Sequence, residues 1–236
     1  MTEEIFRADP YARTCEAVVV AADEGGIELD RTVFYPKGGG QPGDTGHLRA
    51  GDGRVVPIVD TCVDRATGRH VHVPGPGAPG LAAGDTVMAE LDWERRHRLM
   101  RMHTCLHLLC AVVHGPVTGG SVGEAKGRLD FDLPEMTLDK DHITAELNRL
   151  IAENHPVGAT WITDDEMAAK PDLVRTMSVK PPAGTGRVRV MEVEGVDLQP
   201  CGGTHVRATG EIGRVRVGKI EKKGRHNRRV NVLFDE

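Results

Sequence analysis

Four side chains able to bind a metal ion stand in two pairs of equal spacing. His103 and His107 lie four residues apart in R-M-H-T-C-L-H-L-L, and Cys201 and His205 lie four apart in C-G-G-T-H. On a helix the first spacing puts both imidazoles on one face, one turn apart. The glycines of the second pair allow a turn in which thiol and imidazole converge. Three imidazoles and a thiolate form a donor set that favours zinc.

Other interpretations of these side chains stay open. Either pair alone is weak evidence, because histidines packed on an apolar helix need no metal. Cys110 and His114 extend the face of His103, at i+7 and i+11, and either could replace one of the four ligands. We expect both instead to be core residues at the end of the helix Arg95–His114.

Bulk composition limits the classes of protein to be considered. A chain of 236 residues with 39% hydrophobic content can bury a sizeable core, and we expect two domains. The net charge of −5 does not attract nucleic acid, so any such binding must use a local patch. Five cysteines without a disulfide-framework spacing indicate a reducing compartment. With no apolar leader or run of about 18 apolar residues, we expect a cytoplasmic protein without membrane contact.

The first half of the chain is typical of β structure. Short segments rich in β-branched residues alternate with Gly, Pro and Asp, as in a small barrel or sandwich. They read C-E-A-V-V-V-A-A, G-I-E-L-D, G-H-L-R-A, R-V-V-P-I-V-D and R-H-V-H-V, and L-A-A-G-D-T-V-M-A-E-L-D-W ends the series. We expect residues 1–92 to form a glycine-rich, β-barrel-like domain.

A glycine-rich segment, T-V-F-Y-P-K-G-G-G-Q-P-G-D-T-G, interrupts this half at Thr32–Gly46. Consecutive glycines allow positive φ and a close backbone approach to another surface. A flexible surface loop is the alternative, although aromatic and amide side chains beside the glycines suit a loop that docks. The residues concerned are Phe34, Tyr35, Gly38, Gly39, Gly40 and Gln41.

The second half mixes helices with strands. After the histidine helix and a glycine-rich turn comes the strand G-R-L-D-F-D-L, and then an amphipathic helix over Thr137–Asn154 with Thr137 as its N-cap. Further strands read V-G-A-T-W-I-T, R-V-R-V-M-E-V and I-G-R-V-R-V-G-K-I-E, with a short helix D-D-E-M-A-A-K between them. We expect residues 93–236 to be an α+β domain that binds zinc.

The stretch K-I-E-K-K-G-R-H-N-R-R is basic within an acidic chain. Basic runs are usually solvated faces, and the alternative is a phosphate contact. The candidates are Lys222, Lys223, Arg225, Arg228 and Arg229, which Arg95, Arg96, Arg98 and Arg101 could extend.

Four motifs in order resemble one known family. They are the segment Thr32–Gly46, the helix R-x-R-M-H-T-C-L-H-L-L, the strand R-L-D-F-D and V-D-L-Q-P-C-G-G-T-H-V-R-A-T-G-E-I-G-R. Together they resemble the editing module of alanyl-tRNA synthetases, and more closely the free-standing AlaX trans-editing proteins of medium length. Family members typically have alanine where this chain has Cys105, which adds a thiol near the expected site.

The resemblance implies hydrolysis of mischarged tRNA(Ala), chiefly its serine ester and as an option its glycine ester, without ATP and without a stable protein partner. It implies one zinc ion on His103, His107, Cys201 and His205. By similarity, Thr32 is the candidate for recognising the serine hydroxyl. Gln41 could bond the ester or the terminal adenosine, and the glycine loop would lie near the metal. Because no adenylate-forming domain fits beside the two domains, we expect action in trans on tRNA charged elsewhere.

The mechanism and two rival functions stay open at this point. Four protein ligands fill a tetrahedral site, which is typical of structural zinc, whereas catalysis needs an open or exchangeable position. We favour an exchangeable position. One rival is a non-catalytic tRNA-binding module with structural zinc. The other is a zinc hydrolase of a small ester or amide.

Overall fold

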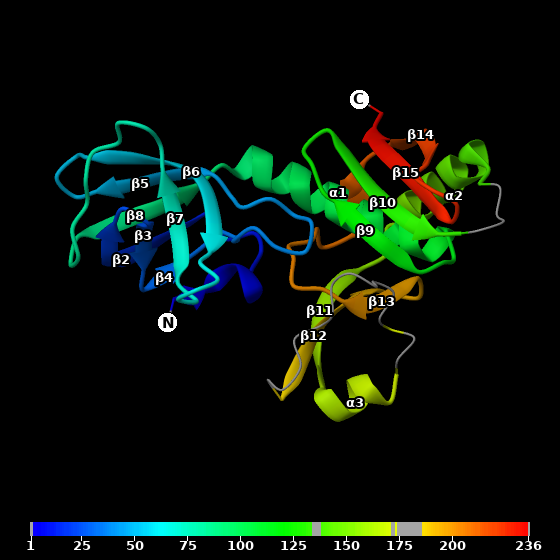
Figure 1. The fold of residues 1–236 in the computed structure, drawn as a ribbon, viewed down its shortest axis with the longest axis horizontal. Helices are drawn as coiled ribbons and strands as arrows, with labels where there is room; N and C mark the ends of the chain where they lie inside the picture. Colours follow the sequence, from blue (N-terminus) through cyan, green and yellow to red (C-terminus); the bar gives the residue numbers. More distant parts are fainter. Residues whose placement is uncertain (1, 134–137, 171–172, 174–185, 236) are drawn as a thin grey trace. The chain divides into compact units, whose positions relative to one another are not determined.

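The computed structural model describes residues 2–133, 138–170, 173 and 186–235. The described chain is mostly β with few helices, and it separates into two compact units, Met1–His97 and Arg98–Glu236 (Figure 1). The division of the chain into domains at Trp93 stays a prediction. None of the helices within the described ranges combines the length and apolar character that a membrane crossing requires.

The first unit contains a closed six-stranded barrel, so the prediction of a barrel-like element is confirmed. Adjacent strands pair antiparallel throughout. The short strands β1 (Glu3–Glu4) and β4 (Arg31–Thr32) pair in parallel beside it, and the 3-10 helix η1 spans Ile5–Arg7. In their order around the barrel the strands are β2 (Thr14–Asp23), β3 (Gly26–Leu29), β7 (His70–Pro74), β6 (Val55–Val63), β5 (Gly46–Ala50) and β8 (Thr86–Leu91).

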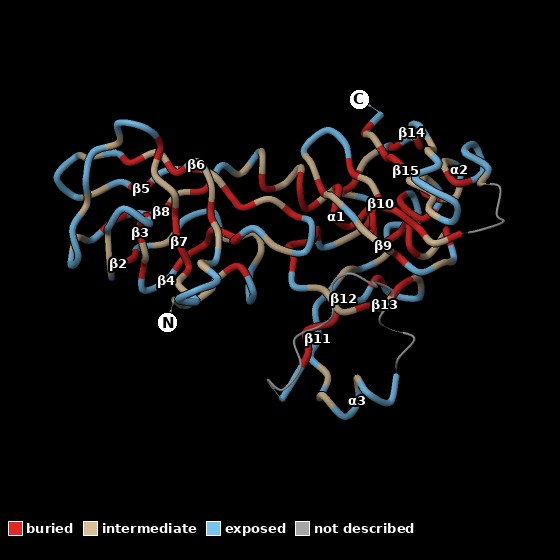
Figure 2. The backbone as a smooth tube through the Cα atoms, in the orientation of Figure 1, coloured by how far each residue is buried: buried red, intermediate tan, exposed pale blue. Residues whose placement is uncertain are grey.

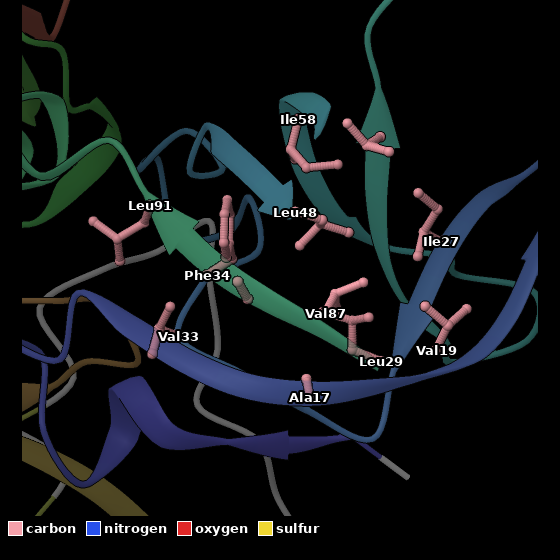
Figure 3. Packing of buried hydrophobic residues seen from close by; sticks show 12 residues of the cluster. Ala17, Val19, Ile27, Leu29, Val33, Phe34, Leu48, Ile58, Val87 and Leu91 are labelled. Carbon is pink, nitrogen blue, oxygen red and sulfur yellow. The ribbon is translucent and has the colours of Figure 1, made fainter. Parts of the chain in front are cut away.

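The interior of this barrel is apolar because its strands alternate. Along β8 buried and exposed positions follow each other, and Figure 2 shows the same alternation along neighbouring strands. Burial of such side chains from opposite strands is the main term that stabilises the barrel. Figure 3 shows the resulting cluster, which includes Ala17, Val19, Ile27, Leu29, Val33, Phe34, Leu48, Ile58, Val87 and Leu91.

A buried ion pair fixes the glycine-rich segment to the start of helix α1 (Trp93–Val112). The guanidinium of Arg96 is 0% exposed and binds both carboxylate oxygens of Asp44, which is 1% exposed. Arg96 also donates to the carbonyl of Val33 at 2.7 Å, and Asp44 accepts from the backbone N–H of Tyr35 at 2.6 Å. Such a pair is tolerated in a core only when its remaining hydrogen bonds are made, as they are here.

Helix α1 also supports the sheet of the second unit. That sheet is antiparallel with the order β14-β15-β10-β9, and its strands are β14 (Val215–Lys222), β15 (Asn227–Phe234), β10 (Lys126–Asp132) and β9 (Val117–Ser121). A Cβ at Gly127 would lie 2.7 Å from the sulfur of Met102 and 3.2 Å from Leu106. Glycine at this position therefore lets β10 approach the helix that carries the histidines.

Helix α2 (Lys140–Ala152) corrects the predicted start of the amphipathic helix. Its N-cap is Asp139, whose side chain accepts from the backbone N–H groups of Asp141 and His142. The predicted cap, Thr137, lies outside the described residues. The amide of Asn148 bonds both backbone groups of Val215, which attaches α2 to β14.

A three-stranded antiparallel sheet has the order β11-β12-β13, with β11 (Val157–Thr163), β12 (Arg187–Val193) and β13 (Asp197–Pro200). The short helix α3 (Asp164–Ala168) follows β11 and is capped by Thr163. Strands β11 and β12 have the predicted bounds, whereas β9, β13 and β15 were not predicted as strands. The glycines of β9 and the charges of β15 concealed their β character. Helix α1 begins two residues before the predicted Arg95 and ends two before His114.

Candidate metal centre

The second unit brings the four predicted ligands together. One ligand atom from each of His103, His107, Cys201 and His205 lies within 4.8 Å of those of the other three. The sulfur of Cys201 is 3.5 Å from Nε2 of His103 and 3.3 Å from Nε2 of His205. The three imidazoles are buried, while Cys201 is half-buried. This group of described residues could hold a metal ion. Cys110 and His114 lie outside it. Cys110 is buried as expected, whereas the expectation that His114 is a core residue is wrong, because His114 is exposed and follows the end of α1.

Thr104 fixes the orientation of His205, a role that the sequence analysis missed. Its hydroxyl donates to the carbonyl of Met100 at 3.0 Å, one turn back on α1. The same oxygen lies 3.1 Å from Nδ1 of His205 and accepts from the backbone N–H of Val206 at 3.3 Å. Since its one proton is already donated, the oxygen accepts from Nδ1–H. Nε2 of His205 is then unprotonated and faces Cys201, as a metal ligand must.

Asp197 plays a similar part for His107. Its Oδ2 lies 3.3 Å from Nδ1 of His107 and accepts from the side-chain amide of Gln199 at 2.7 Å. Asp197 and Gln199 are 5% exposed, and both belong to β13. A carboxylate on the outer nitrogen of a metal-binding histidine orients the ring and raises its basicity. Asp197 and Gln199, which precede C-G-G-T-H in the sequence, therefore support the candidate metal ligands. In the sequence, only their position close to that motif could have indicated this role.

Arg189 holds the turn that presents Cys201. Its guanidinium donates to the carbonyl of Cys201 at 2.8 Å and to that of Gly203 at 3.1 Å. The backbone N–H of Cys201 in turn donates to the carbonyl of Arg189 at 3.2 Å. The N–H of Gly203 points at the sulfur at 3.4 Å, where it stabilises negative charge. The turn is thus attached to β12 at two points.

The protonation states of Cys201 and His205 suit a metal, whereas His107 must lose a proton before it can bind one. Burial opposes a thiolate, but His103 and His205 lower the pKa of Cys201 well below its usual range. Burial and the charge of His103 lower the pKa of His205. For His107 burial opposes the charged form, yet the nearby Asp197 and Cys201 raise its pKa to about 9. A thiolate beside a neutral imidazole is the form in which both bind metal.

The glycine-rich segment lies in the first unit and is fixed to the barrel. Gly38 and Gln41 exchange backbone hydrogen bonds of 3.0 and 2.9 Å around Gly39 and Gly40, whose φ values of 56° and 83° favour glycine. The N–H of Lys37 donates to the carbonyl of Thr61 on β6 at 2.7 Å. Phe34 belongs to the barrel core, and the buried ring of Tyr35 packs against Phe6, so both aromatic side chains beside the glycines serve packing within this unit. The approach of this loop to the metal group stays a prediction.

Thr32 is fully buried beside the barrel. His72 is neutral, because burial and the nearby His70 lower its pKa to about 3. Its Nδ1 lies 3.0 Å from the carbonyl of Ile27 and therefore carries the proton, which leaves Nε2 to accept from the hydroxyl of Thr32 at 2.8 Å. The same hydroxyl accepts from the N–H of Phe34. Gln41 is also buried, 1% exposed. The role of both residues in substrate recognition stays a prediction.

The basic candidates lie on the hairpin of β14 and β15. Arg229 binds both oxygens of Asp130 at 2.7 and 2.8 Å, and Lys223 lies 2.7 Å from Glu221. Lys222 and Arg225 are exposed, and Arg228 is half-buried. Of the arginines on α1, Arg96 is buried in its pair with Asp44 and is withdrawn from any surface patch.

Known protein families and individual relatives are similar to this chain over most of its length. The family model "Threonyl and Alanyl tRNA synthetase second additional domain" matches residues 188–231, and "tRNA synthetases class II (A)" matches residues 5–95. The alanyl-tRNA editing protein AlaX-M of Methanosarcina acetivorans is 39% identical over 98% of both chains, and that of Saccharolobus solfataricus is 30% identical over 98% of both. An alanine-tRNA ligase of Pyrobaculum calidifontis is 36% identical over 94% of this chain and 25% of the ligase.

Proposed function

Because the chain belongs to the AlaX-M family of alanyl-tRNA editing proteins, we propose that it hydrolyses the ester of serine, and optionally of glycine, on mischarged tRNA(Ala). The observation that carries the proposal is the convergence of three imidazoles and a thiol within 4.8 Å in a member of this family. The enzyme would act in trans, in the cytoplasm, on tRNA charged by a separate synthetase.

Zinc is the proposed ion. Nitrogen and sulfur donors at this spacing suit it, and buried ligand atoms with oriented outer nitrogens are typical of zinc sites. When bound, zinc supplies a Lewis acid that polarises a carbonyl or activates water. The chain's own residues hold the ligands in place: Thr104 sets the tautomer of His205, Asp197 orients His107 and Arg189 fixes the turn of Cys201.

An exchangeable position is proposed at the side of Cys201. Cys201 is the half-buried member of the group, whereas the imidazoles are 7%, 6% and 2% exposed. We propose that substrate approaches the group from the side of this residue. A closed four-ligand site would instead favour the rival, a tRNA-binding module with structural zinc.

Selectivity for serine over alanine is a matter of pairing buried polar groups. A synthetase pocket for a small apolar side chain rejects the hydroxylated isostere by only about 100-fold, so a second, hydrolytic site is needed. A site that bonds the hydroxyl can discriminate by roughly 10⁴ to 10⁵. Thr32 and Gln41 stay the candidates for this recognition, and Lys222, Lys223, Arg225, Arg228 and Arg229 those for the acceptor end of the tRNA. Thr32→Val should lower stability in any case, because it removes the bond to His72.

The test is deacylation of labelled Ser-tRNA(Ala) and Ala-tRNA(Ala) in parallel by wild type and Cys201→Ala. Rapid release of serine, retention of alanine and loss of activity in the variant would support the proposal. Release from neither ester by the folded, zinc-loaded protein would contradict it and favour the binding module. Equal hydrolysis of small esters that carry no RNA would favour the rival hydrolase.

A further inference from the structure

Strand β11 exposes the one tryptophan of the second unit. Trp161 is 47% exposed, and the other exposed large hydrophobic side chains among the described residues are valines and one methionine. The guanidinium of Arg187 lies over its ring, 5.0 Å from the centroid. An exposed aromatic ring beside an arginine offers a π-face on which a nucleic-acid base can stack.

The pairing register puts this ring on the sheet face that carries the metal centre. Trp161 pairs with Arg189 on β12, whereas Asp197 and Gln199 on β13 pair with Val193 and Met191. Directly paired residues, and residues two apart on one strand, share a face. The ring therefore lies on the face of Asp197, which contacts His107, and of Arg189, which holds the turn of Cys201.

The distance along this face suits a nucleic-acid strand. Trp161 opposes Arg189, and the backbone of Arg189 bonds that of Cys201 on its other side. With strands about 4.8 Å apart, the Cα atoms of Trp161 and Cys201 are separated by about 10 Å. The terminal nucleotides of a strand whose 3′ ester lies at Cys201 can span that distance.

Charge decides between stacking and phosphate binding. Helix α3 adds Asp164, Asp165 and Glu166 directly after the strand. The side chain of Asp164 accepts from the backbone of Gly186, and that of Glu166 from the backbone of Thr163. These carboxylates repel a phosphate group, whereas they interact little with the uncharged face of a base.

We propose that Trp161, assisted by Arg187, stacks on an unpaired base at the 3′ end of the substrate RNA and so positions its ester at the metal centre. This inference rests on the proposed function. Trp161 is then a positioning residue. Its contribution to RNA affinity requires unpaired nucleotides and does not depend on the salt concentration.

The test uses the full chain and two RNAs that carry no amino acid. One is an acceptor-stem hairpin with its unpaired 3′ nucleotides, and the other is the same hairpin without them. Trp161→Ala should weaken binding of the first by roughly tenfold, as expected for one base stack, and leave binding of the second unchanged. The salt dependence of binding of the first hairpin by Trp161→Ala should match that of wild type, because no phosphate contact is lost. Trp161→Phe should retain most of the affinity, and Val20→Ala, another exposed position, should retain all of it.

A second measurement guards against a folding defect. In a Trp93→Phe background Trp161 is the remaining tryptophan, and its fluorescence should be quenched by the first hairpin and not by the second. Unquenched fluorescence, or equal affinities of wild type and Trp161→Ala for the first hairpin, would overturn the inference. If wild type still deacylates tRNA in that case, the proposed function stands. If wild type binds neither hairpin and deacylates nothing, both fail.

Discussion

Replacement of Thr104 by valine tests whether its hydroxyl prepares the metal centre. Valine keeps the shape of the side chain but removes the oxygen that bonds Met100, His205 and Val206. Two buried N–H donors then lose their acceptor, at about 1 to 3 kcal/mol each if neither finds another. The ring of His205 can rotate or change tautomer. Since loss of such an outer partner typically lowers metal affinity by about 10 to 100-fold, we expect a loss in that range.

The assay is competition for zinc with a chromophoric chelator near pH 7. Thr104→Ser is the matched control, because it keeps the hydroxyl and removes only a methyl group. We expect the serine variant to remain within a factor of about three of wild type and the valine variant to fall at least about tenfold below it. A folded Thr104→Val protein with the affinity of wild type would refute the argument from the tautomer of His205. So would a serine variant as weak as the valine variant.

Three further predictions concern the buried groups. Arg96→Met should lower the free energy of unfolding, measured in urea, by about 3 to 5 kcal/mol, because it leaves the carboxylate of Asp44 buried without its cation. If Asp44→Asn lowers that free energy by the same amount in the Arg96→Met variant as in wild type, the two side chains are not coupled. The folded pKa of His72, about 3, lies below the ordinary 6.5, so its contribution to stability is complete above pH 6.5 and falls as the pH drops toward 3. Between pH 7 and 5 wild type should therefore lose about 2 kcal/mol more than His72→Gln in urea titrations, and equal losses would contradict this. Cys105 is 0% exposed, so iodoacetamide should label it in mass spectra only after unfolding, and labelling as fast as that of the half-buried Cys62 would disprove its burial.

The convergence of the four candidate metal ligands could be predicted from the sequence because its signal is local. The spacing of His103 and His107 requires only a helix, and that of Cys201 and His205 only a turn. Strands such as β5, β11 and β12 were predictable for the same reason, since alternation and flanking glycines belong to the strand itself. Thr104 and Asp197 were not, because their roles depend on which residues meet across long stretches of chain.

The missed features follow from packing that no short segment encodes. The strand β15 carries two adjacent arginines near its start, yet Arg229 is matched by Asp130 on β10, almost one hundred residues away. Phe34 and Tyr35 suggested a docking surface but are buried in the barrel unit. Arg96 was a candidate for a basic surface, but it is buried in an ion pair with Asp44. In each case a distant partner of opposite charge or an apolar neighbour determines what the side chain does.

The central claim is that the group of His103, His107, Cys201 and His205 performs metal-dependent editing. Its most direct test measures release of labelled serine from Ser-tRNA(Ala) by the protein after removal of metal and after its restoration with one equivalent of zinc. We predict no release above the uncatalysed rate by the metal-free protein, and full recovery on addition of zinc. Undiminished release by metal-free, folded protein would contradict the account.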